Sequence, residues 1–154
     1  MLIDKRLREF IESSERLKQK YGDKVEFYVC GKPEKKESLG FNEEQINVWV
    51  DSGLIKYLGH IDSVVEQMIK SDCIVLPSYR EGTPRVLLEA AAVGRPILTT
   101  DAPGCREVVQ NNINGLLCEV KDANGLYIIM EKMFLTNPEK KTRNGYKGKT
   151  NSRK

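Results

Sequence analysis

Short apolar runs alternate along the chain with longer stretches in which apolar side chains recur every three or four residues. The short runs are rich in β-branched residues and end near glycine, proline or polar residues, which is typical of strands. They predict five strands, at residues 25–30, 55–58, 73–76, 96–99 and near 116–118. Each run is continuously apolar rather than alternating, which favours a parallel sheet covered on both faces.

The longer stretches predict helices with suitable boundary residues. These helices begin after Asp4, at Asn42, near Ser63, at Pro84, near Arg106 and at Asp122. Ser63 and Glu66 have the spacing of a capping box, and Gly94 ends the helix that begins at Pro84. The helix near Arg106 is short and extends to Val109.

Alternating strands and helices predict a Rossmann-like α/β domain over residues 1–137, with helices on both faces of a parallel sheet. Doubly wound sheets usually open on a strand, whereas this chain opens on a helix. We therefore expect the first strand of the domain to be missing. Residues 138–154 lack an apolar face and are expected to form a poorly ordered basic tail.

Composition agrees with one globular domain. The chain has 154 residues, of which 40% are hydrophobic and 31% charged, and no apolar run is long enough to span a membrane. The first ten residues carry five charged side chains, so they do not resemble a secretory signal peptide. We expect a cytoplasmic protein.

The charge is unevenly distributed. Residues 139–154 carry a net charge of +6, which leaves −3 on the rest of the chain. The acidic body argues against a nucleic-acid partner. The tail could contact the inner face of an anionic membrane as a peripheral anchor, although the plainer interpretation is a solvated chain end.

Metal and redox chemistry have little support. The four cysteines, Cys30, Cys73, Cys105 and Cys118, form no CxxC pair, and His60 is the single histidine. We expect reduced thiols and no metal site. There is also no GxGxxG, P-loop or Asp-x-Asp motif, and one histidine leaves little basis for a catalytic triad.

The segment from Pro77 to Arg85 is the strongest candidate site, because ligands of such sheets bind beyond the carboxyl ends of the strands. Thr83 is a suitable N-cap, Pro84 suits the first helical position, and Gly82 allows close approach to the backbone. The helix N-terminus would then suit a diphosphate. The alternative is a capped helix that binds nothing.

Two carboxylates accompany this segment. Glu89 lies in the most apolar part of the helix, where it either pairs with Arg85 or accepts hydroxyl groups of a bound sugar. The backbones of Glu81 and Glu89 should lie about 12 Å apart, too far for a proton-sharing pair, so they would hold different parts of one elongated ligand. Lys5 could reach a phosphate or simply be solvated.

These residues resemble a known family. Residues 81–90, EGTPRVLLEA, followed by Gly94, Arg95 and Pro96, are similar to the E-x7-E signature of the family 4 (group 1) retaining glycosyltransferases. The resemblance extends to residues 77–80, 101–109, 114–115, 58–60 and 4–10, and covers about residues 2–137. It implies a GT-B architecture of two Rossmann-like domains, of which this chain resembles the C-terminal, donor-binding half.

The resemblance also implies roles for residues. Glu81 would face the donor sugar, Glu89 would bind ribose hydroxyls and Lys5 would help neutralise the diphosphate. The remaining donor-binding positions would be Gly82, Thr83, Pro84, Ser78 and His60. The family transfers a sugar, with retention and usually without a metal, and we expect a UDP-linked donor and a glycan or lipid-linked acceptor in cell-surface polysaccharide biosynthesis.

The sequence departs from the family pattern at its ends. The arginine that the family places five residues before Lys5 would fall before Met1, and the N-terminal acceptor domain has no counterpart. We therefore expect little transfer by the isolated chain. Two alternatives stay open, a non-catalytic nucleotide-binding module and a donor subunit with a separate acceptor-domain partner. A nucleotide-sugar epimerase is disfavoured by the single histidine, His60.

Overall fold

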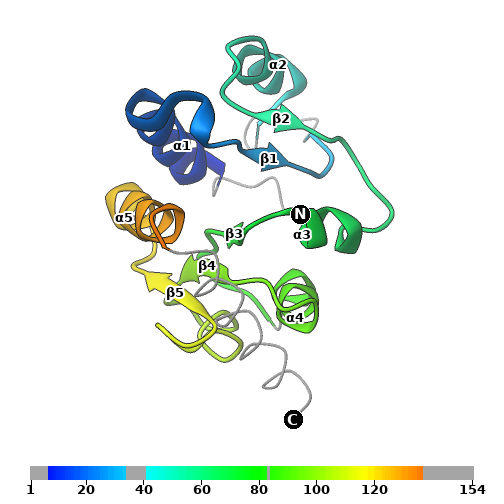
Figure 1. Cartoon of the computed structure of the whole chain (residues 1–154). Helices are drawn as coiled ribbons and strands as arrows, with labels where there is room; N and C mark the ends of the chain where they lie inside the picture. The colour runs from blue at the N-terminus through cyan, green and yellow to red at the C-terminus, as the bar shows by residue number, and fades with distance from the viewer. Residues whose placement is uncertain (1–6, 34–40, 83, 137–154) are drawn as a thin grey trace. The chain divides into compact units, whose positions relative to one another are not determined.

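The computed structural model describes residues 7–33, 41–82 and 84–136, shown as coloured ribbon in Figure 1. The chain divides into two compact units, Met1–Asp62 and Ser63–Lys154. Two of the predicted site residues, Lys5 and Thr83, and the basic tail from 138 lie outside the described residues.

In its described residues, the first unit contains two α-helices, a 3-10 helix and a pair of parallel strands. Its elements are α1 (Leu7–Tyr21), the short 3-10 helix η1 (Gly22–Lys24), β1 (Tyr28–Val29), α2 (Glu43–Asp51) and β2 (Lys56–Tyr57). β1 and β2 pair in parallel, with Tyr28 opposite Lys56. Phe10 of α1 packs edge-on against Phe27, with ring centroids 5.9 Å apart, which attaches the helix to the chain entering β1.

The predicted cap of α2 is confirmed. The Asn42 side chain accepts from the Gln45 amide at 2.9 Å, and the Gln45 side chain accepts from the Asn42 amide at 3.0 Å. This reciprocal capping box satisfies two amides at the start of the helix, so the local sequence is sufficient to place its N-terminus.

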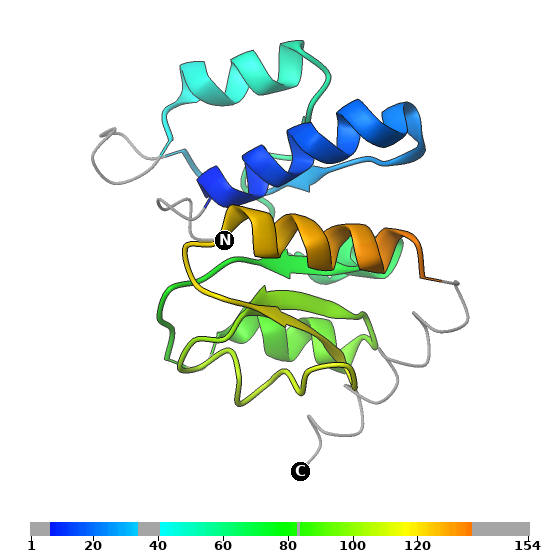
Figure 2. The same ribbon diagram turned by 90° about the vertical axis from the view of Figure 1, so that its left-hand side faces the viewer.

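The second unit is a three-stranded parallel sheet flanked by helices. In chain order its elements are α3 (Val65–Lys70), β3 (Ile74–Leu76), α4 (Arg85–Ala92), β4 (Ile97–Thr100), β5 (Gly115–Cys118) and α5 (Ala123–Phe134). The strands lie in the order β3-β4-β5. Figures 1 and 2 show α4 and α5 on opposite faces of this sheet.

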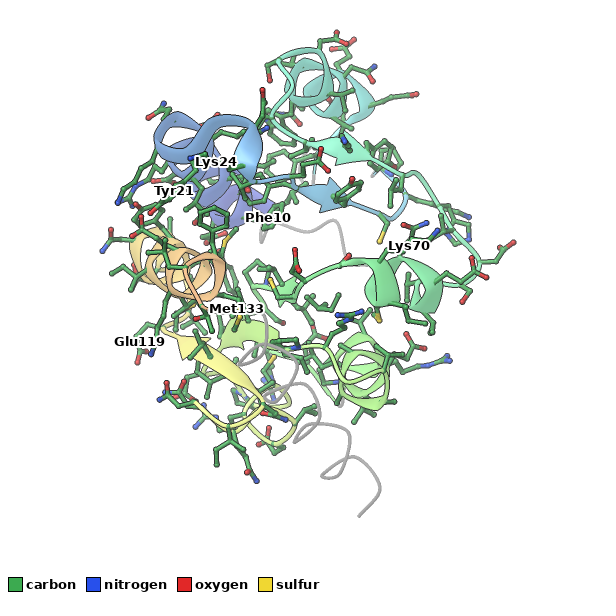
Figure 3. The ribbon with its side chains drawn as sticks, in the orientation of Figure 1. Phe10, Tyr21, Lys24, Lys70, Glu119 and Met133 are labelled. Atoms are coloured by element: carbon green, nitrogen blue, oxygen red, sulfur yellow. The ribbon has the colours of Figure 1, made fainter. Side chains whose placement is uncertain are left out.

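Both faces of the sheet are packed. On one side, Leu87 and Ala90 of α4 join Ile97 of β4 and Met68 of α3 in a buried apolar cluster. On the other, α5 buries Leu126, Ile129, Met130 and Met133. Figure 3 shows Met133 on the side of α5 that faces the strands. This packing explains why the strands are continuously apolar in sequence.

The predicted fold class is confirmed as Rossmann-like α/β with parallel strands, although several details differ. The five strands pair as two separate ladders, one in each unit, within the described residues. The short helix predicted at residues 106–109 is absent, and residues 103–108 form turns instead. α3 begins one residue after Val64 without a side-chain cap, so the capping box predicted from Ser63 and Glu66 is wrong.

In the described part of the chain, no helix is both long and apolar enough to cross a membrane.

Candidate functional site

The loops that follow β3 and β4 meet at the carboxyl edge of the sheet. The Glu81 amide in the first loop donates to the Pro103 carbonyl in the second at 3.1 Å. The chain leaving β5 contacts both loops. The Asp101 amide, after β4, donates to the Cys118 carbonyl at the end of β5 at 2.7 Å. The Lys121 ammonium, after β5, lies 5.4 Å from the ring centroid of Tyr79, which follows β3. Parallel strands bring these loops together because their carboxyl ends share one edge.

The Glu81 carboxylate is held by its own loop. The Ser78 hydroxyl donates to Glu81 Oε1 at 2.6 Å, and Ser78 is fully buried. The Thr100 hydroxyl at the end of β4 in turn donates to the Ser78 carbonyl. Such short bonds to a carboxylate are stronger than neutral ones, so this carboxylate has a defined orientation.

Gly104 permits the close approach of the two loops. A Cβ atom on this residue would lie 2.0 Å from the Gly82 carbonyl oxygen and 2.5 Å from that of Glu81. Its φ of +88° also falls in the region that only glycine adopts without strain. Its amide donates to Glu107 Oε2 at 2.6 Å, so Glu107 fixes the second loop while Glu81 is fixed on the first.

The Cys105 thiol lies behind this contact. It is fully buried, and burial raises its pKa, although it interacts with the hydroxyl groups of Thr99, Ser78 and Thr100. A buried thiol with a raised pKa stays protonated and unreactive at neutral pH. Cys105 is therefore a packing residue, a member of the buried apolar cluster of the second unit whose thiol meets the hydroxyl groups near the Glu81 loop.

The N-terminus of α4 lies beside the same loop. The helix begins at Arg85, and Pro84 occupies the N-cap position without a side-chain cap. The prediction that Pro84 takes the first helical position, with Thr83 as the cap, is therefore displaced by one residue. Pro84 is buried, whereas Gly82 is exposed at the edge of the sheet.

Glu89 lies farther along α4, on its partly exposed flank. Its side chain is 32% exposed, and Oε1 lies 3.8 Å from the Arg85 guanidinium, one turn earlier and 91% exposed. The i,i+4 pair, one of the two alternatives for Glu89, is thus present. The Glu89 side chain is partly exposed, although Leu87 and Ala90 of the same helix are buried.

His60 belongs to the other unit. It is exposed, and its Nε2 lies 3.9 Å from Asp62. Within the second unit, the structure brings Ser78, Glu81 and Gly82 together with Pro84 at the start of α4. The absence of a metal site stays a prediction. In the described ranges, no group of three or more potential metal ligands comes together.

Three residues that support Glu81 were not singled out from the sequence. Thr100, Gly104 and Glu107 lie 19 to 26 positions beyond Glu81 and act through the tertiary contact between two loops. Gly104 and Glu107 lie within the resemblance at residues 101–109, but their roles could not be inferred there. The only local signal for Thr100 is a hydroxyl residue where a buried strand ends.

Relatives with known names share most of this chain. The chain is 36% identical over 142 residues to N,N'-diacetylbacillosaminyl-diphospho-undecaprenol alpha-1,3-N-acetylgalactosaminyltransferase of Campylobacter jejuni. The aligned region covers 92% of this chain and 35% of that protein. The chain spans about a third or less of the length of the curated relatives that it matches first.

Solved structures share the fold. S. aureus TarM, in a complex that contains UDP, superposes with a TM-score of 0.83 at 22% identity, covering 98% of this chain and 30% of that one. The C-terminal domain of a group 1 glycosyl transferase, LpcC from Francisella tularensis, superposes with a TM-score of 0.74 at 23% identity, covering 94% and 76%.

The family assignment rests on the sequence itself. The sequence profile described as "Glycosyl transferases group 1" matches residues 2–134, nearly the whole of the described chain and both loops of the candidate site. This chain therefore belongs to the group 1 glycosyltransferase family.

Proposed function

We propose that this chain is the donor-binding half of a retaining glycosyltransferase that moves a sugar from a UDP-linked donor to a glycan or lipid-linked acceptor. The observation that carries the proposal is the orientation of Glu81. Its carboxylate is bonded to Ser78 and its amide to Pro103, next to the N-terminus of α4. A carboxylate fixed beside a helix N-terminus provides a sugar-binding group next to an anion-binding one.

The proposed roles are those that the family resemblance implies. Glu81 binds the donor sugar, Glu89 binds the ribose hydroxyls, and the backbone from Gly82 to Pro84 lies along the sugar and diphosphate. Lys5 and the first amides of α4 stabilise the negative charge that develops on the departing diphosphate, which is the main catalytic contribution. His60 is proposed to lie near the nucleotide. No metal is required in this scheme.

The relatives support the substrate classes. The name of the Campylobacter jejuni relative includes a diphospho-undecaprenol, which is a lipid-linked acceptor, and the TarM structure contains UDP. The LpcC structure supports the assignment to a donor half because it is a C-terminal domain, and this chain covers 76% of it. We infer an acceptor-binding domain elsewhere, in the same protein or in a partner subunit.

The first test is calorimetric titration of the chain with UDP, GDP and ADP, each with and without magnesium. Selective binding of UDP in both conditions is the expected result. Selective binding of GDP or ADP would revise the donor, and a requirement for magnesium would contradict the metal-free scheme. Binding of no nucleotide would reject the donor-binding assignment for this chain.

Activity requires an acceptor domain as well. The chain together with a separately expressed acceptor domain should transfer label from a radiolabelled UDP-sugar to a lipid-linked acceptor. The chain without that domain should transfer no label. Transfer by the chain alone would contradict the proposed division of labour. If the chain is instead a non-catalytic binding module, it should bind nucleotide but transfer no sugar, with or without the acceptor domain.

A further inference from the structure

We propose that Ser78 and Thr100 are positioning residues that set the orientation of the Glu81 carboxylate for the donor sugar. The inference rests on the proposed function, in which Glu81 binds the sugar. It changes the role of Ser78, which the resemblance assigns to direct donor binding, and adds a residue on a different strand.

Burial argues against direct contact between Ser78 and a ligand. Ser78 has no exposed surface, and its hydroxyl proton is directed to Glu81 Oε1 at 2.6 Å. A hydroxyl has a single proton to donate, so this bond occupies its donor capacity. The bond joins residues three positions apart in one loop and leaves Glu81 at the edge of the sheet, half-exposed, where a ligand could reach it.

Thr100 anchors the same loop from β4. Its side chain is 2% exposed, and its hydroxyl donates to the Ser78 carbonyl. The contact follows from strand register, because Leu76 is paired with Thr99, which places Thr100 beside the chain that leaves β3. Ser78 is thus held by its backbone while its side chain holds Glu81.

A second bond fixes the other end of the segment. The Glu81 amide donates to the Pro103 carbonyl, three residues after Thr100 in the loop that follows β4. Glu81 is therefore restrained at its backbone by one contact and at its carboxylate by another. The Ser78 bond restricts the rotamers of the partly exposed Glu81 side chain, and a side chain that is already ordered loses less conformational entropy when a ligand binds.

The chain offers a matched control in Thr99. This residue is also fully buried, and its hydroxyl donates to a backbone carbonyl, that of Leu76 at 2.7 Å. Thr99→Val and Thr100→Val thus remove the same group from adjacent buried positions. Both hydroxyl groups also interact with the Cys105 thiol. They differ in the carbonyl that accepts from them, which belongs to β3 for Thr99 and to the Glu81 loop for Thr100. Thr100→Ser keeps the hydroxyl and should rescue the Thr100→Val phenotype.

The first measurement needs no ligand. Three-bond NMR couplings that report the χ1 angle of Glu81 should indicate one rotamer in the wild-type chain and in Thr99→Val. In Ser78→Ala and Thr100→Val they should be averaged over several rotamers. A single Glu81 rotamer in Ser78→Ala, or equal averaging in Thr99→Val and Thr100→Val, would overturn the inference.

The second measurement compares UDP with UDP-N-acetylglucosamine by calorimetry. Ser78→Ala and Thr100→Val should weaken binding of the sugar nucleotide by about tenfold and change UDP affinity less than about twofold. Equal losses for both ligands would contradict positioning through Glu81. A wild-type chain that binds neither ligand would reject the proposed function, and the NMR couplings would still decide whether Ser78 and Thr100 orient Glu81.

Discussion

The loop that carries Glu81 and the flank of α4 that carries Glu89 are eight residues apart in sequence and differ in how they hold a carboxylate. Glu81 is restrained through its backbone by Pro103 and through its side chain by Ser78. Glu89 has a regular helical backbone, and its side chain lies 3.8 Å from the 91% exposed Arg85. The first carboxylate is oriented by a loop that tertiary contacts hold in place, whereas the second lies on a regular helix beside an exposed partner.

This difference suits the two proposed roles. A group that faces the reacting sugar gains from preorganisation, since a small misplacement is costly in the transition state. A group that binds ribose hydroxyls through a partly exposed side chain can exchange its contact with the exposed Arg85 for a ligand at little cost, because such surface pairs contribute little stability. Four substitutions test the contrast, in order of expected effect.

Gly104→Ala should have the largest effect, because the new Cβ would overlap the carbonyl oxygens of Glu81 and Gly82 at a positive φ. We expect the free energy of unfolding in urea to fall by about 2–4 kcal/mol, with loss of sugar-nucleotide binding. Gly53→Ala is the control, since it has a φ of +74° and open space around it, and should cost about 1–2 kcal/mol. Equal losses in the two variants would mean that the loops are not tightly packed.

Glu81→Ala should weaken binding of UDP-N-acetylglucosamine by about 2 kcal/mol while UDP affinity changes by less than about 0.5 kcal/mol. The reason is that the carboxylate is directed to the sugar rather than to the nucleotide. Glu81→Gln, which keeps an oxygen acceptor for Ser78, separates charge from orientation. Calorimetry with both ligands gives the result, and equal weakening would show that the role assigned to Glu81 is wrong.

Glu89→Ala should reduce UDP affinity by about 1.4 kcal/mol, because it removes the proposed acceptor for the ribose hydroxyls. The free energy of unfolding should change by less than about 0.5 kcal/mol, since this side chain is partly exposed. Glu66→Ala, at an exposed position of α3, controls for the loss of a helical carboxylate. Unchanged UDP affinity in Glu89→Ala would identify a purely structural carboxylate.

Arg85→Ala should have the smallest effect. Its pair with Glu89 is exposed and 3.8 Å long, so both the free energy of unfolding and UDP affinity should change by less than about 0.5 kcal/mol. Urea unfolding and calorimetric titration with UDP, each at low and high salt, check this prediction. If the pair contributed significantly, screening by salt would reduce the difference between the wild-type chain and Arg85→Ala. A larger loss of UDP affinity would place Arg85 in the donor site.

Sequence-based prediction succeeded where the contacts join residues close together in the sequence. The caps at Asn42 and Asp122 were predicted, because each bonds an amide three residues away. Gly94 was likewise predicted to end α4, and it lies just after the helix with a φ of +75°. Ser63 had the same local pattern but formed no cap, because α3 begins one residue later than that pattern requires.

The sequence by itself determined the alternation of strands and helices, the Rossmann-like class and the family signature. The spacing of apolar residues and the helix caps depend on residues only a few positions apart, so they can be recognised in the sequence. Only the tertiary structure decided that Thr100 supports Ser78, that Gly104 contacts the Glu81 loop and that Glu89 is half-exposed. The contacts of Thr100 and Gly104 join residues about twenty positions apart, and they depend on the register of β3 against β4, which is set by packing on both faces of the sheet.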